Sequence, residues 1–470
     1  VTNNRNSMGR FYETFGNSVA ATMERDLSEA TYAKTKVTEP MWYNADPPDK
    51  KVNWSLRNNT NYMQSGVLAS LKFTARNGDM LLHNFWQKGI NSIERGKKEA
   101  PYAFVIPKEQ RDQARLEYLL TQLDRHGIEI HRATEAFKLE DGDFDAGDYI
   151  VRCDQPYGNF ARNLLEHRDF PKEAEHRPYD DVAWSLGLHY GVDVWPIKDK
   201  TVLDLAAIER AHAPFPIERG VDEGKAAAYA IANTGNYRLI TARYMLKGVT
   251  VLAAEEVFEA GGVKYPRGSW ILPNKGGLRH GELQAAAERC VLRIHSLEAM
   301  PKVPTHSLDP PKLALYHTWV STQPDGWARY TLEQFGVPYT YINDDDVRRG
   351  GLRSRFDVII VADQGGVSAR SMVQGRDTKF GPMPYTTARE FPSQGVIDSA
   401  NDITGGFGFE GAENLQHFLN SGGTLLMFGS SGKLATDLGL LRNVTSAMGV
   451  DTPGSFLQAK VLREDHPIVY

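Results

Sequence analysis

The residue best suited to acid–base chemistry is Glu13, which lies among aromatic residues near the start of the chain. It belongs to the segment 9–17 (GRFYETFGN), which ends in a Gly-Asn pair typical of a tight turn. A carboxylate at the edge of a strand, in a partly apolar wall, can take a proton as a general base. The alternative is an exposed glutamate that only neighbours core aromatics. We therefore name Glu13 as the candidate catalytic residue.

Histidines that could serve as metal ligands are missing from the start of the chain, since the first histidine is His83. Two His-x-x-Glu pairs, at His126–Glu129 and His295–Glu298, have ligand types that zinc uses, but the first spans a helix end and a strand start. Neither pair predicts a zinc site, and no metal ligand is assigned. The chain opens on Val1 and runs directly into the Glu13 motif, so we expect it to be part of a longer protein.

Composition limits the class of protein and its partners. The 470 residues allow two to four domains, and hydrophobic and aromatic fractions of 41% and 10% argue for folded cores. A net charge of −5 is too small to favour nucleic acid as a partner. No apolar run reaches the length of a membrane-spanning helix, and no secretory signal is visible. Cys153 and Cys290 favour two buried free thiols, with a disulfide as the alternative.

An internal repeat with an offset of 121 residues relates two segments, near 102–165 and 227–290. Each copy reads as a strand, a helix and a second strand, followed by a Gly-turned hairpin over 144–151 or 265–272. The sequence thus predicts a duplicated β-α-β plus hairpin module within residues 101–300. The aligned pairs include Gly127 with Gly248, Phe137 with Phe258, Phe144 with Tyr265, Gly147 with Gly268, and Tyr149 with Trp270.

Residues 312–470 follow a proline-rich linker and alternate apolar strands with helices. Strands are expected at 313–316, 339–342, 356–361 and 424–428, with helices at 326–335 and 415–419, which predicts a doubly wound parallel sheet. Segment 365–412 is long and rich in Gly, Pro and Ser, and an insertion of this length is often functional. The chain ends within what reads as continuing structure, so we also expect it to be truncated at the C-terminus.

Three short motifs in this last unit have both a chemical and a structural interpretation. The stretch Phe428–Lys433 follows a strand, and its amides suit either an anion nest or a simple strand-to-helix turn, which we favour. Ser430 and Ser431 lack the Gly-x-Ser-x-Gly context of a nucleophile. Asp344–Asp346 suit a metal or, more simply, the start of a helix.

The phrases at 9–17, 52–59 (VNWSLRNN), 102–107 and 154–157 together resemble large bacterial zinc-carboxypeptidase-like proteins of the carboxypeptidase A superfamily, over most of residues 1–300. The resemblance implies that residues 1–100 are the last part of the peptidase domain. It implies that Glu13 matches the catalytic glutamate and that the zinc ligands lie upstream of Val1. The tail from Lys312 is similar to the class I glutamine amidotransferase-like fold, without its cysteine.

This resemblance implies a function as well as an α/β fold. The chain would be the C-terminal portion of a zinc metallocarboxypeptidase that removes C-terminal residues from peptide substrates, inactive alone, in a periplasmic or secreted protein. The alternative is a non-catalytic α/β protein, derived from a degenerate peptidase, that binds a peptide or glycan. A third interpretation is an amidotransferase-like enzyme that acts through Ser430 or Ser431. The sequence leaves the oligomeric state open.

Overall fold

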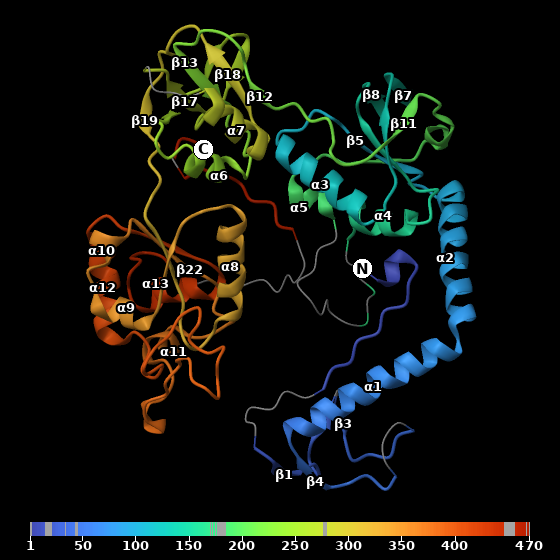
Figure 1. Cartoon of the computed structure of the whole chain (residues 1–470), viewed down its shortest axis with the longest axis vertical. Coiled ribbons are helices and arrows are strands. Elements are labelled where there is room, and N and C mark those ends of the chain that lie inside the picture. The colour runs from blue at the N-terminus through green and yellow to red at the C-terminus, as the bar shows by residue number, and fades with distance from the viewer. Residues whose placement is uncertain are drawn as a thin grey trace.

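Three sheets of more than two strands follow one another along the described part of the chain, and helices accompany each of them (Figure 1). The computed structural model describes residues 2–14, 21–32, 34–42, 46–169, 171, 173, 175, 185–275, 280–445, 456–466 and 468–469. The protein is therefore mixed α/β, as expected.

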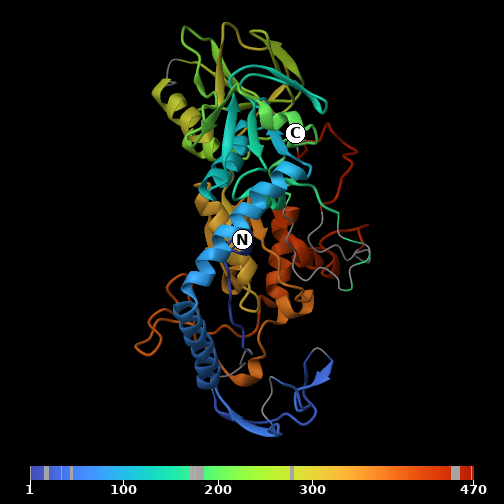
Figure 2. The same cartoon turned by 90° about the vertical axis from the view of Figure 1, so that its right-hand side faces the viewer.

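Two long helices form an arm at one side of the molecule (Figures 1 and 2). Helix α1 begins with a capping box between Ser55 and Asn58, and α2 follows it after one residue. Asn59 is the only residue of α1 that is buried, whereas Leu68 and Leu71 are exposed, so packing within the described residues covers little of this helix. The elements of this region are η1 (Asn3–Arg5), β1 (Met23–Asp26), β2 (Thr31–Tyr32), β3 (Thr35–Lys36), β4 (Lys51–Trp54), α1 (Leu56–Arg76) and α2 (Gly78–Lys98).

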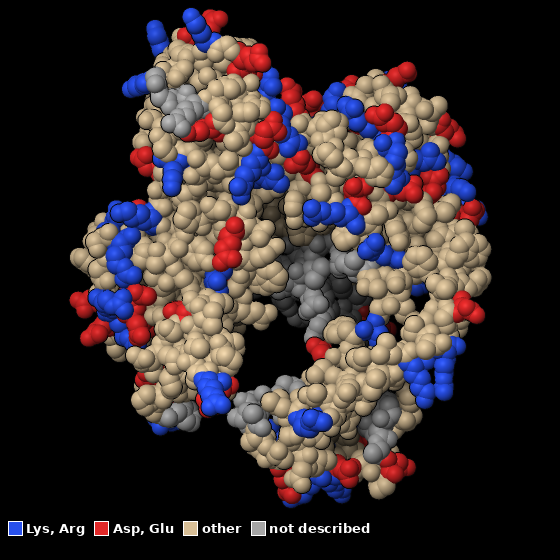
Figure 3. Space-filling model, viewed as in Figure 1, with Lys and Arg blue, Asp and Glu red and all other residues tan. Residues whose placement is uncertain are grey.

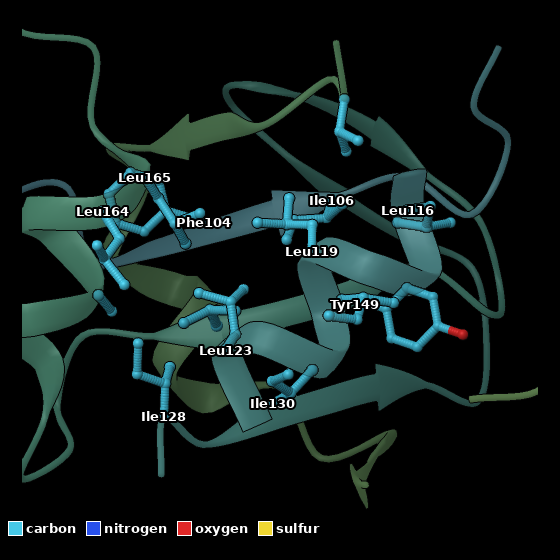
Figure 4. Close-up of a cluster of buried hydrophobic side chains, with 14 of the residues drawn as sticks. Phe104, Ile106, Leu116, Leu119, Leu123, Ile128, Ile130, Tyr149, Leu164 and Leu165 are labelled. Carbon is cyan, nitrogen blue, oxygen red and sulfur yellow. The ribbon is translucent and has the colours of Figure 1, made fainter. Parts of the chain in front are cut away.

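The first large sheet has the strand order β10-β5-β9-β6-β11, with every neighbouring pair antiparallel. Figure 4 shows the apolar face of helix α3, with Leu119 and Leu123, against sheet residues that include Ile106. The elements are β5 (Ala103–Ile106), α3 (Gln113–Arg125), β6 (Ile130–Ala133), β9 (Tyr149–Arg152), α4 (Gly158–Leu165), α5 (Leu186–Tyr190), β10 (Trp195–Ile197), η2 (Lys200–Asp204) and β11 (Ile208–Ala211).

The second large sheet has the order β12-β18-β13-β17-β14-β19 and repeats the plan of the first. Strands β13, β17 and β14 take the places of β5, β9 and β6. Strands β18 and β19 pair antiparallel with β13 and β14, as β10 and β11 do with β5 and β6, and β12 adds a sixth strand, parallel to β18. The elements are β12 (Gly220–Val221), β13 (Ala228–Ile231), α6 (Leu239–Met245), β14 (Leu252–Ala254), β17 (Trp270–Pro273), α7 (His280–Cys290), β18 (Arg293–Leu297) and β19 (Thr305–Ser307).

The hairpin of each copy is formed by other strands than the sequence predicts. Strand β8 (Gly142–Phe144) pairs with β7 (Phe137–Leu139), and β16 (Val263–Tyr265) pairs with β15 (Phe258–Ala260). The expected hairpin over 144–151 is wrong, since Phe144 pairs with Phe137 of β7, where the two rings stack at 5.2 Å. The backbone then turns at Gly147, with φ of +98°, and returns into the main sheet as β9.

The third sheet is fully parallel with the order β21-β20-β22-β23, which confirms the parallel sheet expected here. Right-handed crossovers place α8 on the opposite face from α9, α10 and α12, as Figure 1 shows. The elements are β20 (Leu313–Tyr316), α8 (Gln323–Gln334), β21 (Thr340–Ile342), α9 (Asp344–Arg349), α10 (Leu352–Arg355), β22 (Val358–Val361), α11 (Ala369–Gln374), η3 (Thr378–Phe380), α12 (Gly408–Asn420), β23 (Thr424–Met427), η4 (Gly429–Gly432) and α13 (Lys433–Asp437).

None of the helices in the described residues combines the length and the apolar character that crossing a bilayer requires.

Candidate functional site

Glu13 lies in an irregular, exposed segment rather than at the edge of a strand. The neighbouring Tyr12 anchors this segment to helix α1, since its hydroxyl lies 2.5 Å from Ser70 Oγ and its ring fills a notch at Gly66. A Cβ atom on Gly66 would lie 2.8 Å from that ring. The Gly-Asn turn expected after Glu13 falls outside the described residues. The assignment of Glu13 as general base thus stays a prediction.

The described residues do not fit a zinc ion. No three His, Cys, Asp or Glu side chains among them come together as a metal site would require. His126 instead packs edge-on against Phe160 at 5.4 Å, and burial lowers its pKa, helped by the charge of Arg5. His295 pairs with Asp222 at 3.2 Å. We therefore derive no catalytic step through zinc.

The carboxyl edge of the parallel sheet, where doubly wound folds bind ligands, carries a buried polar cluster. His317 follows β20, is 2% exposed, and places Nε2 2.6 Å from Asp398 Oδ2. Asn343, which follows β21, donates to the same oxygen at 2.8 Å. Burial alone would raise the pKa of Asp398, but hydrogen bonds from His317 and Asn343 lower it. Because Asp398 belongs to segment 365–412, the cluster anchors this insertion over the sheet edge.

The serines after β23 make hydrogen bonds within the turn that follows this strand. Ser430 Oγ donates to Asp363 Oδ1 at 2.6 Å and accepts from the amides of Gln364 and Gly366, both at 3.1 Å. The Ser430 amide also donates to Asp363. A carboxylate of the chain itself therefore occupies the position that a bound anion would take in the anion nest considered for Phe428–Lys433. These hydrogen bonds lower the pKa of Asp363. Ser431 is buried and donates to the Phe428 carbonyl.

The Asp344–Asp346 run starts helix α9, as favoured from the sequence, and the cap itself is Asn343. The Asn343 side chain accepts from the Asp345 amide at 2.9 Å. The three acidic residues form the first turn, where the helix dipole favours negative charge.

A cleft of about 650 Å³ lies where the three α/β units meet. Its walls come from helices α3, α5, α6, α7 and α8, and Figure 3 shows a hollow near the centre of the molecule with Lys and Arg side chains beside it. No Asp or Glu is found among the described residues that line it. They are Arg115, Tyr118, His189, Tyr190, Tyr237, Arg238, Thr241, Arg289, Tyr330, Thr331, Gln334 and Phe335.

Tyr237 is the centre of the cleft wall. The guanidinium groups of Arg115 and Arg238 lie 5.8 and 5.4 Å from its ring centre, and Arg238 Nε donates to its hydroxyl at 3.1 Å. Phe335 of the third unit meets the same ring edge-on at 5.4 Å. Burial raises the pKa of Tyr237, although Arg238 opposes this, so the phenol is neutral and can donate a hydrogen bond. One ring thus joins all three units.

The three arginines of the cleft differ in their partners. Arg115 pairs with Asp112 at 3.1 Å, and Arg238 lies 3.6 Å from Glu117, which also binds Arg219 at 2.5 Å. Arg289 is exposed, and its guanidinium makes no hydrogen bond or ion pair within the described residues. Its backbone is fixed, since its carbonyl accepts from Arg238 Nη1 at 3.2 Å. Among the described residues that line the cleft, Arg289 is therefore the arginine that is available to a ligand.

Sequence reasoning missed this cleft. Its walls are helices that are widely spaced along the chain and carry no shared motif. The Tyr237–Arg238 pair at the start of α6 was the one local signal, and it carries no chemistry by itself.

Comparison with protein-family models, curated proteins and solved structures found no match. What the chain itself defines is a mixed α/β protein with a parallel sheet and a cationic, aromatic cleft.

Proposed function

We propose that the protein binds a ligand that carries a carboxylate next to an apolar group, in the cleft between its three α/β units. The observation that carries this proposal is the lining of the cleft, which combines arginine and tyrosine with no acidic residue among those described. Pockets with aromatic walls and a few well-placed polar groups are typical of small-ligand and peptide sites. This agrees with the interpretation of the chain as a non-catalytic binding protein.

The positive charge of the cleft favours a ligand that carries a carboxylate. Arg115 and Arg238 pair with acidic residues of the chain, whereas Arg289 is exposed and lines the cleft. A guanidinium fork matches a carboxylate in shape and binds it through two parallel hydrogen bonds. The neutral hydroxyls of Tyr190 and Tyr237, whose pKa values are raised mainly by burial, add further donors.

The apolar part of the ligand is selected by exposed aromatic surface. The ring of Tyr118 meets Tyr190 edge-on at 5.3 Å, and Tyr118 is 39% exposed. Tyr330, on the facing helix α8, is 55% exposed. Such rings offer large contact area at little cost in side-chain entropy. A peptide with a free C-terminus combines both features that the cleft selects.

The peptidase activity implied by the resemblance is a separate proposal. It requires Glu13 as general base and zinc ligands that lie outside the described residues. Its substrates would also carry a free carboxylate. Binding in the cleft requires neither Glu13 nor a metal, so the two proposals are tested separately.

The test is calorimetric titration of the chain with the peptide acetyl-Ala-Ala-Phe, either with a free C-terminus or amidated. We expect the amide to bind about tenfold more weakly, because it loses a charge-assisted bidentate contact. Arg289→Ala should remove this preference. Arg442→Ala is the matched control, since Arg442 is exposed and lies outside the lining of the cleft. Equal affinity for both peptides, or no binding of either, would overturn the proposal.

A further inference from the structure

The C-terminal segment 456–466 is an extended, irregular stretch that reaches the rim of the cleft. The ring of Phe456 meets the ring of His189 edge-on, with centroids 4.7 Å apart and an angle of 80°. His189 lines the cleft and is followed directly by Tyr190. Figures 1 and 2 show this segment, coloured red, as an open ribbon that does not join any sheet.

An aromatic strip begins where Phe456 is seated. His189 and Tyr190 belong to α5, and Tyr190 contacts Tyr118 of α3 at 5.3 Å. A second aromatic side chain of an extended peptide can continue along this strip, while its backbone amides meet the tyrosine hydroxyls. Phe456 therefore lies at one end of a row of aromatic side chains that leads along the cleft.

Among the described residues, few contacts hold segment 456–466 to the rest of the chain. Within the described residues, its hydrogen bonds and ion pairs are local, as between Arg463 and Asp465 at 3.2 Å. Phe456 is 44% exposed, whereas Leu457 and Leu462 are 75% and 83% exposed, so Phe456 is its main apolar contact. Hydrogen bonds from Arg463 lower the pKa of Asp465, and the charge of Arg267 in the second unit adds a smaller effect. A segment held by so few contacts can be displaced.

We infer that the ligand of the cleft is an extended peptide with an aromatic residue seated on His189, and that segment 456–466 occupies this seat until another peptide displaces it. This inference rests on the proposed function. A tethered segment competes at an effective concentration on the order of 1 mM. If the seat binds the segment with a Kd of about 0.1 mM, the tether weakens the binding of an outside peptide about tenfold.

The test uses the full chain and a fluorescein-labelled peptide with the sequence of residues 456–466, followed by fluorescence polarisation. The Phe456→Ala chain should bind this peptide about tenfold more tightly than wild type, because its own segment no longer fills the seat. Leu462→Ala is the matched control, since Leu462 is 83% exposed, and should bind as wild type does. In a His189→Ala background, Phe456→Ala should have no further effect.

Equal affinity of the wild-type and Phe456→Ala chains for the labelled peptide would overturn the inference. The acetyl-Ala-Ala-Phe titration separates this failure from that of the proposed function. If that peptide binds both chains with one affinity, the cleft is a binding site but segment 456–466 does not occupy it. If it binds neither chain, the proposed function fails as well.

Discussion

The burial of Asp344 provides a quantitative test of the structure of the third unit, through the pH dependence of its stability. The Asp344 side chain is 3% exposed at the start of α9 and accepts a 2.6 Å hydrogen bond from the Tyr316 hydroxyl. Burial raises its pKa from 3.8 to about 6, against the effect of that hydrogen bond. Because the folded pKa lies above the unfolded one, the charged form is disfavoured in the folded state. The contribution of Asp344 to stability is therefore fully present below pH 4 and is lost as the pH rises through 6.

The magnitude follows from linkage between the two pKa values. The buried charge costs on the order of 1–2 kcal/mol at pH 5 and about 3 kcal/mol at pH 7. Asp344→Asn removes this cost and keeps an oxygen to accept from Tyr316. We therefore expect the variant to be more stable than wild type, by about twice as much at pH 7 as at pH 5.

Hydrogen exchange of the buried strands β20 and β22 measures the stability of this unit separately from the rest of the chain. Exchange of wild type, Asp344→Asn and the control Glu413→Gln is compared at pH 5 and pH 7, corrected for intrinsic rates. Glu413 is an exposed acid on α12, so its variant should follow wild type at both values. A difference between Asp344→Asn and wild type that does not grow with pH would refute the reasoning.

Three further predictions concern other parts of the chain. Cys153 and Cys290 should not react with Ellman's reagent until the protein is unfolded, since burial raises their pKa values to about 12 and about 11; rapid reaction of the native chain would contradict this. Gly96→Ala should lower the melting temperature, because its Cβ would lie 2.1 Å from the Cys153 carbonyl oxygen. Gly78→Ala should leave the melting temperature unchanged, because its Cβ would have no atom within 4 Å. Equal melting curves for the two variants would be inconsistent with this packing. Glu13→Gln should leave peptide affinity in calorimetry unchanged, and a lost affinity would link the Glu13 segment to the cleft.

Local patterns in the sequence predicted much of the fold. The apolar strand at 356–361 and its neighbours predicted a parallel sheet, because strands covered on both faces are apolar throughout. The aromatic residues and glycines that recur at 121 residues pointed to two copies of one unit, and the five strands of the first sheet have counterparts in the same order in the second. The hairpin partners were wrong because pairing depends on the stacking of Phe137 on Phe144, which spacing alone does not reveal.

The cleft could not be predicted from local sequence patterns. Arg115, Tyr237 and Phe335 lie far apart in the sequence, and each has the ordinary appearance of a helix-surface residue. Only the docking of three units brings them together around one ring. Ser430 is the opposite case, since the missing Gly-x-Ser-x-Gly context favoured a turn and the structure shows its hydroxyl bound to Asp363.

The central claim is that the cleft, and not the carboxyl edge of the third sheet, binds the ligand. The most direct measurement is hydrogen exchange of the whole chain with and without saturating acetyl-Ala-Ala-Phe. We predict slower exchange in α3, α5, α6, α7 and α8, which line the cleft, and unchanged exchange after β20 and β21, around His317 and Asn343. Protection confined to the residues around His317 and Asn343, with none in the helices of the cleft, would contradict the account.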